Sequence, residues 1–311
     1  MSIVEGASAT LVAGPEPEET PVTLARKPLS RGRLIWNRLV HTPRFWIGAV
    51  AMAIIVLWAV LGPMLYPVDA FSRDPLNMGM GPTQLHWFGT NNIGQDIYAQ
   101  TLIGLQKSLV IGLIAGPLGT LIAAVVGSVA GYVGGVVDSV LVWLINLLLV
   151  LPSFILLVIL SPLFEDLSWV FLTVFLAGFS WMIMAQVIRS QTRSLRGRDF
   201  VKAARYMGVP MRTILSRHII PNVASLLIID ATLGVVAMIM AETSLSYFGF
   251  GIRAPDVSLG TLLSEGTGAA VTRPWLFVFP AGVLIMTLFA VSLIGDALRD
   301  AVDPTSGVNR D

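Results

Sequence analysis

Residues 108–137 read SLVIGLIAGPLGTLIAAVVGSVAGYVGGVV, and no charged side chain occurs between Lys107 and Asp138. The hydrocarbon core of a bilayer requires about 20 apolar residues in a helix, at about 1.5 Å rise per residue. This stretch is long enough to cross a membrane. It also carries small residues four apart, a spacing that predicts close packing against another helix because lipid supplies no hydrophobic drive between helices. These residues are Gly112/Gly116 and Gly127/Gly131/Gly135.

The composition of the whole chain is that of a membrane protein. Of its 311 residues, 55% are hydrophobic and 13% are charged, whereas soluble domains have about 45–50% apolar and about 25% charged residues. The net charge of +1 excludes a strongly basic nucleic-acid binder, so no nucleic-acid partner is expected. The absence of cysteine excludes disulfides, Cys-ligated metals and thiol nucleophiles.

The distribution of charged residues predicts six transmembrane helices. Five long uncharged runs are present, and a sixth apolar run, Pro221 to Tyr247, contains the acids Asp230 and Glu242. We therefore expect an all-α polytopic membrane protein. The five uncharged runs lie between Arg44 and Asp69, Lys107 and Asp138, Asp138 and Glu165, Asp166 and Arg189, and Arg273 and Asp296.

The basic residues predict the orientation. With six spans, 16 of the 20 Lys and Arg residues fall on one side of the membrane, and the positive-inside rule places that side, with both termini, in the cytoplasm. The expected organisation begins with a cytoplasmic N-terminal tail over 1–44, disordered to about 25, and a first transmembrane helix over 45–67. An extracytoplasmic loop with a short amphipathic helix follows over 68–106. A five-helix core over 107–298 includes a cytoplasmic loop over 190–221, and a cytoplasmic C-terminal tail covers 299–311.

The sequence lacks the common motifs for nucleotide binding, nucleophilic catalysis and zinc binding. It has no G-x-x-x-x-G-K-[ST] phosphate loop and no G-x-S-x-G nucleophile elbow. The three histidines, His41, His86 and His218, lie far apart and lack H-E-x-x-H spacing. We therefore expect no catalytic residue, no metal site and no cofactor in this chain.

The two acids of the fifth span are candidates for a translocation path, since intramembrane carboxylates are costly and usually functional. Asp230 and Glu242 are 12 residues apart, which is about 18 Å along a helix and about 120° around it. They cannot share a proton within that helix. Each could instead be satisfied by neighbouring helices; both possibilities stay open for Glu242, whereas the deeper position of Asp230 favours the path.

The cytoplasmic segment 199–208 predicts a two-turn amphipathic helix. Asp199 is a candidate N-cap and Gly208 a candidate terminator, and a second helix should start near Pro210 and run to a break at Pro221. The apolar face must pack either on the protein's own helix ends or in a partner protein. It is formed by Phe200, Ala203, Ala204 and Met207, at i, i+3, i+4 and i+7.

The spacing Ala203-Ala204, Gly208 and His218-Ile219-Ile220-Pro221 resembles the EAA loop of ATP-binding-cassette importer permeases. The chain resembles the C-type membrane subunit of the dipeptide/oligopeptide/nickel branch from about residue 35 to residue 304. It departs from the family at Lys202, where a glutamate is usual and would complete a capping box if Asp199 were the N-cap. The supporting stretches are 88–96, 130–138, 151–153, 241–249 and 295–300.

This resemblance implies a type I importer transmembrane fold in the plasma or inner membrane of a prokaryote. The implied partners are a homologous B-type membrane subunit, two subunits that bind ATP and Mg, an extracytoplasmic substrate-binding protein and the lipid bilayer. Peptides are the implied substrate, with nickel, haem or another small solute as alternatives. Contact with the ATP-binding subunits is implied for Phe200, Ala203, Ala204, Arg205, Met207, Gly208, His218 and Pro221.

Two hypotheses from other functional classes remain open. A proton-coupled secondary transporter would use Asp230 and Glu242 as its proton carriers. An intramembrane hydrolase would require a nucleophile and a base at suitable spacing, and the sequence has none.

Overall fold

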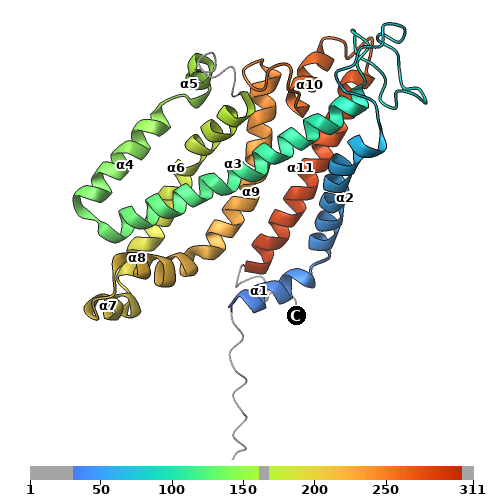
Figure 1. Cartoon of the computed structure of the whole chain (residues 1–311). Coiled ribbons are helices and arrows are strands. Elements are labelled where there is room, and N and C mark those ends of the chain that lie inside the picture. The colour runs from blue at the N-terminus through green and yellow to red at the C-terminus, as the bar shows by residue number, and fades with distance from the viewer. Residues whose placement is uncertain (1–30, 161–167, 303–311) are drawn as a thin grey trace, which may run out of the picture.

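The computed structural model describes residues 31–160 and 168–302, which form helices joined by loops (Figure 1). The expectations for the first 30 residues and for residues 303–311 of the C-terminal tail lie outside the described residues. The helices are α1 (Arg31–Val40), α2 (Pro43–Leu65), α3 (Ile97–Val133), α4 (Gly135–Val150), α5 (Ser153–Leu160), α6 (Ser168–Arg196), α7 (Asp199–Tyr206), α8 (Met211–Ile214), α9 (Ile220–Tyr247), α10 (Leu259–Thr267) and α11 (Trp275–Val302), with a π-helical turn, Leu215–Ile219, between α8 and α9.

The described helices confirm six spans when one bent pair is counted as a single span. Five are long and apolar enough to cross a bilayer: α2, α3, α6, α11, and the unit Met211–Tyr247 that runs from α8 through α9. The sixth is α4 with α5, which are bent by 76°. The bend falls at Pro152, because proline holds the preceding Leu151 in an extended conformation that ends α4.

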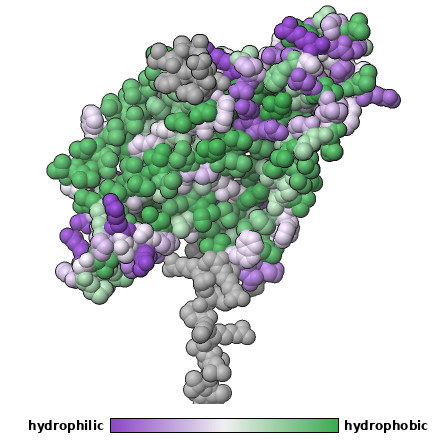
Figure 2. Space-filling model, in the orientation of Figure 1, coloured by the Kyte–Doolittle hydropathy of each residue, from purple (hydrophilic) through white to green (hydrophobic). Residues whose placement is uncertain are grey.

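The surface agrees with a bilayer around the middle of the molecule. Figure 2 shows apolar side chains covering the body of the bundle, with hydrophilic side chains gathered towards its two ends. One end carries α7, α8 and α1, and the other carries α5, α10 and the 66–96 loop (Figure 1). The segments predicted to lie on opposite sides of the membrane are therefore at opposite ends of the bundle.

Helix α3 is the central element, and its small residues let two neighbours approach closely. A Cβ on Gly116 would lie 2.7 Å from the backbone nitrogen of Val235 in α9. A Cβ on Gly131 would lie 2.5 Å from the backbone oxygen of Arg189 in α6. Only glycine permits such contacts, which confirms the close packing that the glycine spacing predicts.

The start of α3 corrects one expectation, because residues 97–106 are not a separate amphipathic helix but the first turns of a 37-residue helix. Its N-cap is Asp96, whose side chain accepts a hydrogen bond from the backbone N–H of Ala99 at 2.8 Å. The same carboxylate bonds the Tyr66 hydroxyl and the His86 ring nitrogen Nδ1, each at 2.7 Å. Burial and this carboxylate raise the pKa of Tyr66, so the phenol keeps the proton that it donates.

Two helices were not expected from the sequence. Helix α1 lies within the predicted N-terminal tail and packs through Leu39 on Ala297 and Ala301 of α11. Helix α10 lies between the last two predicted spans. It starts with a capping box, in which Ser258 and Thr261 bond each other's backbone N–H groups.

Candidate functional site

The amphipathic helix predicted at 199–208 is α7, and only part of its predicted face is free. Phe200 and Met207 are 43% and 75% exposed, and Ala203 is also exposed. Ala204 is 3% exposed, because α7 packs on its own chain through Ala204 and Val201. This corrects the expectation that all four residues share one docking face. We call the exposed set Phe200, Ala203 and Met207 the α7 outer face.

The buried side of α7 is anchored to the helices that follow it. Val201 and Ala204 form a cluster with residues of α8 and of the π-helical turn: Ile214, Leu215 and Ile219. All five are at most 8% exposed. Burying apolar side chains at about 25 cal/mol per Å² is the main force holding such a short helix in place. The α7 outer face is therefore held in a fixed orientation relative to α9.

The ends of α7 differ from the prediction at one terminus and agree at the other. The N-cap is Arg198, so Asp199 is the first helical residue and Lys202 is not at the capping-box position. Gly208 has φ +75°. The Gly208 N–H donates to the Arg205 carbonyl at 3.0 Å, and the Val209 N–H donates to the Ala204 carbonyl at 3.1 Å. These two bonds form a Schellman motif, which confirms Gly208 as the left-handed C-terminal residue.

The predicted break at Pro221 is wrong, because the helix continues through it. Proline lacks an N–H and clashes with the carbonyl four residues earlier in a regular α-helix. Here the π-helical turn precedes it, and the Ile220 N–H donates to the Leu215 carbonyl, five residues back. The wider turn accommodates Pro221, which is exposed in the first turn of α9. The ring of His218, within that turn, lies 6.3 Å from the ring of Phe200.

Glu242 lies inside the bundle, between α9 and α3. It is fully buried, at 0% exposed. Its carboxylate accepts hydrogen bonds from the hydroxyls of Ser108 in α3 at 2.9 Å and of Ser246 in α9 at 2.7 Å. The sequence left two possibilities open for Glu242, a role in the path or hydrogen bonding to neighbouring helices. This geometry agrees with the second. The partners Ser108 and Ser246 were not singled out from the sequence, although Ser246 is four residues from Glu242, within reach on one helix face.

Asp230 is half-buried on α9 and faces α3. Its carboxylate accepts a hydrogen bond from the Thr120 hydroxyl at 2.6 Å. The two acids thus bond different residues of α3, in agreement with the prediction that they do not share a proton. In the described part of the chain, no cluster of three or more His, Asp or Glu residues could hold a metal ion. A role for Asp230 in a translocation path stays a prediction.

Comparison with known proteins matches most of the chain to two families of transport proteins. Residues 123–307 match the family "binding-protein-dependent transport system inner membrane component", and residues 30–82 match the "N-terminal TM domain of oligopeptide transport permease C". The oligopeptide transport system permease protein OppC of Mycobacterium tuberculosis strain H37Rv is 47% identical over 89% of this chain and 96% of its own length. The proteins of that name from Escherichia coli K12 and Bacillus subtilis are 37% and 32% identical, over 92% and 90% of this chain and 96% and 92% of their own lengths.

Proposed function

This chain belongs to the family of binding-protein-dependent transport system inner membrane components, and on that premise we propose that it is the C-type membrane subunit of an ATP-driven oligopeptide importer. The names of its relatives support the substrate class. The chain itself is a non-catalytic, multi-pass component of the inner membrane. ATP and Mg bind to separate ATP-binding subunits, and an extracytoplasmic protein delivers the substrate.

The α7 outer face is the observation that carries this proposal. Phe200, Ala203 and Met207 present an exposed apolar surface on a helix that is anchored by its opposite side. An apolar surface held outside the membrane-spanning body is typical of a protein interface. We assign this surface to a cleft in one ATP-binding subunit.

The helical unit Met211–Tyr247 supplies a mechanical link from α7 to the far side of the membrane. It has 37 residues and spans about 55 Å at 1.5 Å per residue. Because α7 packs on the first part of this unit, a displacement of α7 by closing ATP-binding subunits displaces α9 as well. ATP and the loaded binding protein can favour the outward-facing arrangement only through a higher affinity for that state.

The exposure of α9 is evidence for where the second membrane subunit would bind. In its most apolar window only 17% of the residues are buried, against 50% for α3. Most exposed residues in the second half of α9 fall on one face and leave a stripe that a B-type subunit and the translocation path would cover, whereas the exposed Ile228 lies on another side. This stripe joins Asp230 and Glu242 as a candidate path lining and consists of Leu233, Ala237, Met240, Ser244 and, directly after the helix, Phe248.

Uptake by the reconstituted complex tests the proposed function. Proteoliposomes containing the purified complex should accumulate a radiolabelled oligopeptide when ATP reaches the ATP-binding subunits and the binding protein is present. An imposed proton gradient without ATP should produce no uptake. Uptake driven by the gradient alone would favour a secondary transporter, and ATP-driven uptake of nickel or haem in place of peptide would reassign the substrate.

Cysteine labelling tests the proposed orientation, and the chain has no native cysteine to remove. Met207 and Val271 are 75% and 97% exposed. Met207 directly follows α7 and Val271 lies between α10 and the start of α11, and these segments are at opposite ends of the bundle (Figure 1). A membrane-impermeant maleimide added to intact cells should label Val271→Cys and spare Met207→Cys until the membrane is opened. The reverse pattern would invert the topology.

Gly208→Val should uncouple ATP hydrolysis from transport. A left-handed conformation costs an ordinary residue about 1–2 kcal/mol, and a β-branched residue more. No atom lies within 4 Å of a Cβ at this position, so the effect comes from the backbone and reorients the end of α7. Substrate-stimulated ATP hydrolysis should fall strongly.

The matched control is Gly197→Ala, in the same loop, because Gly197 does not have positive φ and its added Cβ meets only the Ser194 oxygen at 3.5 Å. The control should retain stimulation. Equal stimulation in Gly208→Val and the unsubstituted complex would show that the Schellman motif does not orient the α7 outer face.

A further inference from the structure

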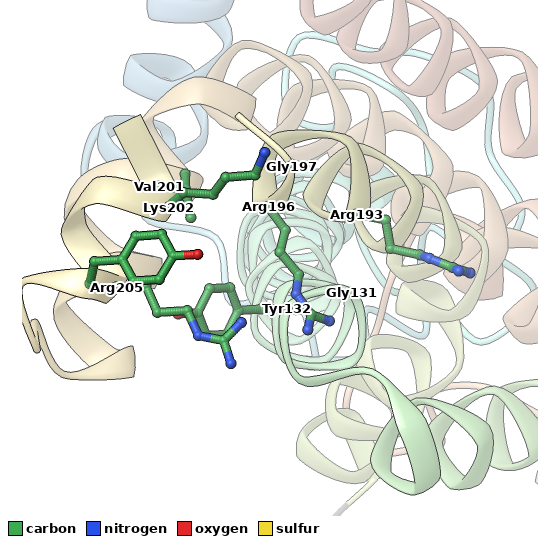
Figure 3. Close-up of a pocket in the computed structure, with 9 residues that line it drawn as sticks. Gly131, Tyr132, Arg193, Arg196, Gly197, Val201, Lys202 and Arg205 are labelled. Carbon is green, nitrogen blue, oxygen red and sulfur yellow. The ribbon is translucent and has the colours of Figure 1, made fainter. Parts of the chain in front are cut away.

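A pocket of about 750 Å³ lies at the α7 end of the bundle, between the ends of α3 and α6 and the side of α7. Figure 3 shows Arg196 and Arg205 extending from α6 and α7 towards the end of α3, where Tyr132 lies. Arg193 and Lys202 complete the basic lining. Four of the nine lining residues are basic and none is acidic.

The basic side chains of this pocket form no salt bridge in the described part of the chain, although Arg193 lies within electrostatic range of Asp138. No salt bridge there involves Arg193, Lys202 or Arg205, and Arg196 donates only to the Val133 carbonyl, at 3.3 Å. The neighbouring Arg189, by contrast, binds Asp138 with Nη2 to Oδ2 at 2.7 Å. Like charges around one cavity repel each other, so a bound anion would stabilise the arrangement.

An exposed apolar surface begins directly beside the pocket. Gly134 joins α3 to α4, and a Cβ there would come within 2.9 Å of Nη1 of Arg196. From this point α4 presents Val136, Val140 and Trp143, which are 79%, 55% and 63% exposed. They lie at i, i+4 and i+7, on one face of the helix. A cationic pocket thus adjoins a face suited to hydrocarbon.

We propose that this pocket binds the phosphate-bearing headgroup of an anionic phospholipid of the cytoplasmic leaflet, with its acyl chains along α4. Guanidinium groups bind phosphate oxygens in bidentate fashion, and basic pockets between transmembrane helices on the cytoplasmic side suit such headgroups. Inorganic phosphate shares this chemistry but makes no use of the α4 face. The inference requires that the α7 end faces the cytoplasm and is independent of which substrate is transported.

Lipid retention by the purified complex tests this site. The variant Arg196→Gln/Arg205→Gln removes two pocket charges, and Arg212→Gln/Arg217→Gln removes two exposed charges that do not line the pocket. Both complexes are placed in phosphatidylcholine nanodiscs with increasing phosphatidylglycerol, and retained lipid is counted by native mass spectrometry. At about fivefold in affinity per basic residue, the pocket variant should bind phosphatidylglycerol about 25-fold more weakly, and the control should match the unsubstituted complex.

Other outcomes overturn the proposal. Equal losses in the pocket variant and the control would indicate general surface charge. Displacement of phosphatidylglycerol by inorganic phosphate would indicate a soluble ligand, and unchanged lipid binding with loss of the ATP-binding subunits would indicate an acidic protein partner. If the pocket variant is unstable in thermal unfolding, Arg193→Gln/Lys202→Gln takes its place, with the same expected loss and the same contrary outcomes.

Discussion

Replacing Ala203 by glutamate is expected to release the ATP-binding subunits from the purified complex while this chain stays folded in the membrane. Ala203 is exposed on the α7 outer face, so its substitution leaves the packing within this chain intact. At an interface, an unpaired buried carboxylate costs about 3–5 kcal/mol, which weakens association by about a hundredfold or more. The measurement is the stoichiometry of ATP-binding subunits after affinity purification through this chain.

Two neighbouring substitutions separate docking from folding. Ala203→Ser adds a small polar group without charge and should retain the ATP-binding subunits. Ala204→Glu places its carboxylate in the buried cluster with Val201, so it should lower the thermal stability of this chain itself. An Ala203→Glu complex with a full complement of ATP-binding subunits and normal uptake would refute the assignment of the α7 outer face.

Glu242→Ala is expected to destabilise the membrane-spanning bundle. The substitution removes the acceptor of two hydrogen bonds, from Ser108 and Ser246, at a fully buried site. An unsatisfied buried hydroxyl costs about 1–3 kcal/mol, and the cavity left by a large-to-small substitution adds a further cost of about 2 kcal/mol or more. Thermal unfolding in detergent should show a marked loss of stability, and the chain should accumulate poorly.

Glu242→Gln is the matched variant, since it keeps the size and a carbonyl acceptor but removes the charge. It should retain most of the stability and transport near the unsubstituted rate. A stably folded Glu242→Gln complex without transport would show that the charge acts in the path and not in packing.

Much of the transmembrane architecture could be predicted, because five spans leave a long run without charges and the sixth leaves an apolar run with two acids. The predictions failed where a helix is short. Helix α10 has nine residues and no long apolar run, although Ser258 and Thr261 at capping-box spacing mark its start. Pro221 suggested a break because proline disrupts a regular α-helix, and nothing in the local pattern indicates the π-helical turn that accommodates it.

The α7 face was predicted only in part, for a similar physical reason. One apolar stripe with helical spacing consists of Phe200, Ala203 and Met207. A second stripe with the same spacing, on the adjacent side of the helix, consists of Val201 and Ala204. Periodicity does not indicate which apolar side packs on the protein's own helices. The position of Glu242 was left open because its satisfaction depends on Ser108, which is 134 residues away in the chain.

Cross-linking from the α7 outer face tests most directly whether it joins this chain to an ATP-binding subunit. Met207→Cys introduces a single cysteine, because the chain has none, at a side chain that is 75% exposed. A short photoactivatable cross-linker on this cysteine should attach to an ATP-binding subunit in the assembled complex, with a yield that changes when ATP binds. Cross-links confined to this chain or to the second membrane subunit, in a complex that still hydrolyses ATP and imports peptide, would contradict the coupling role of α7.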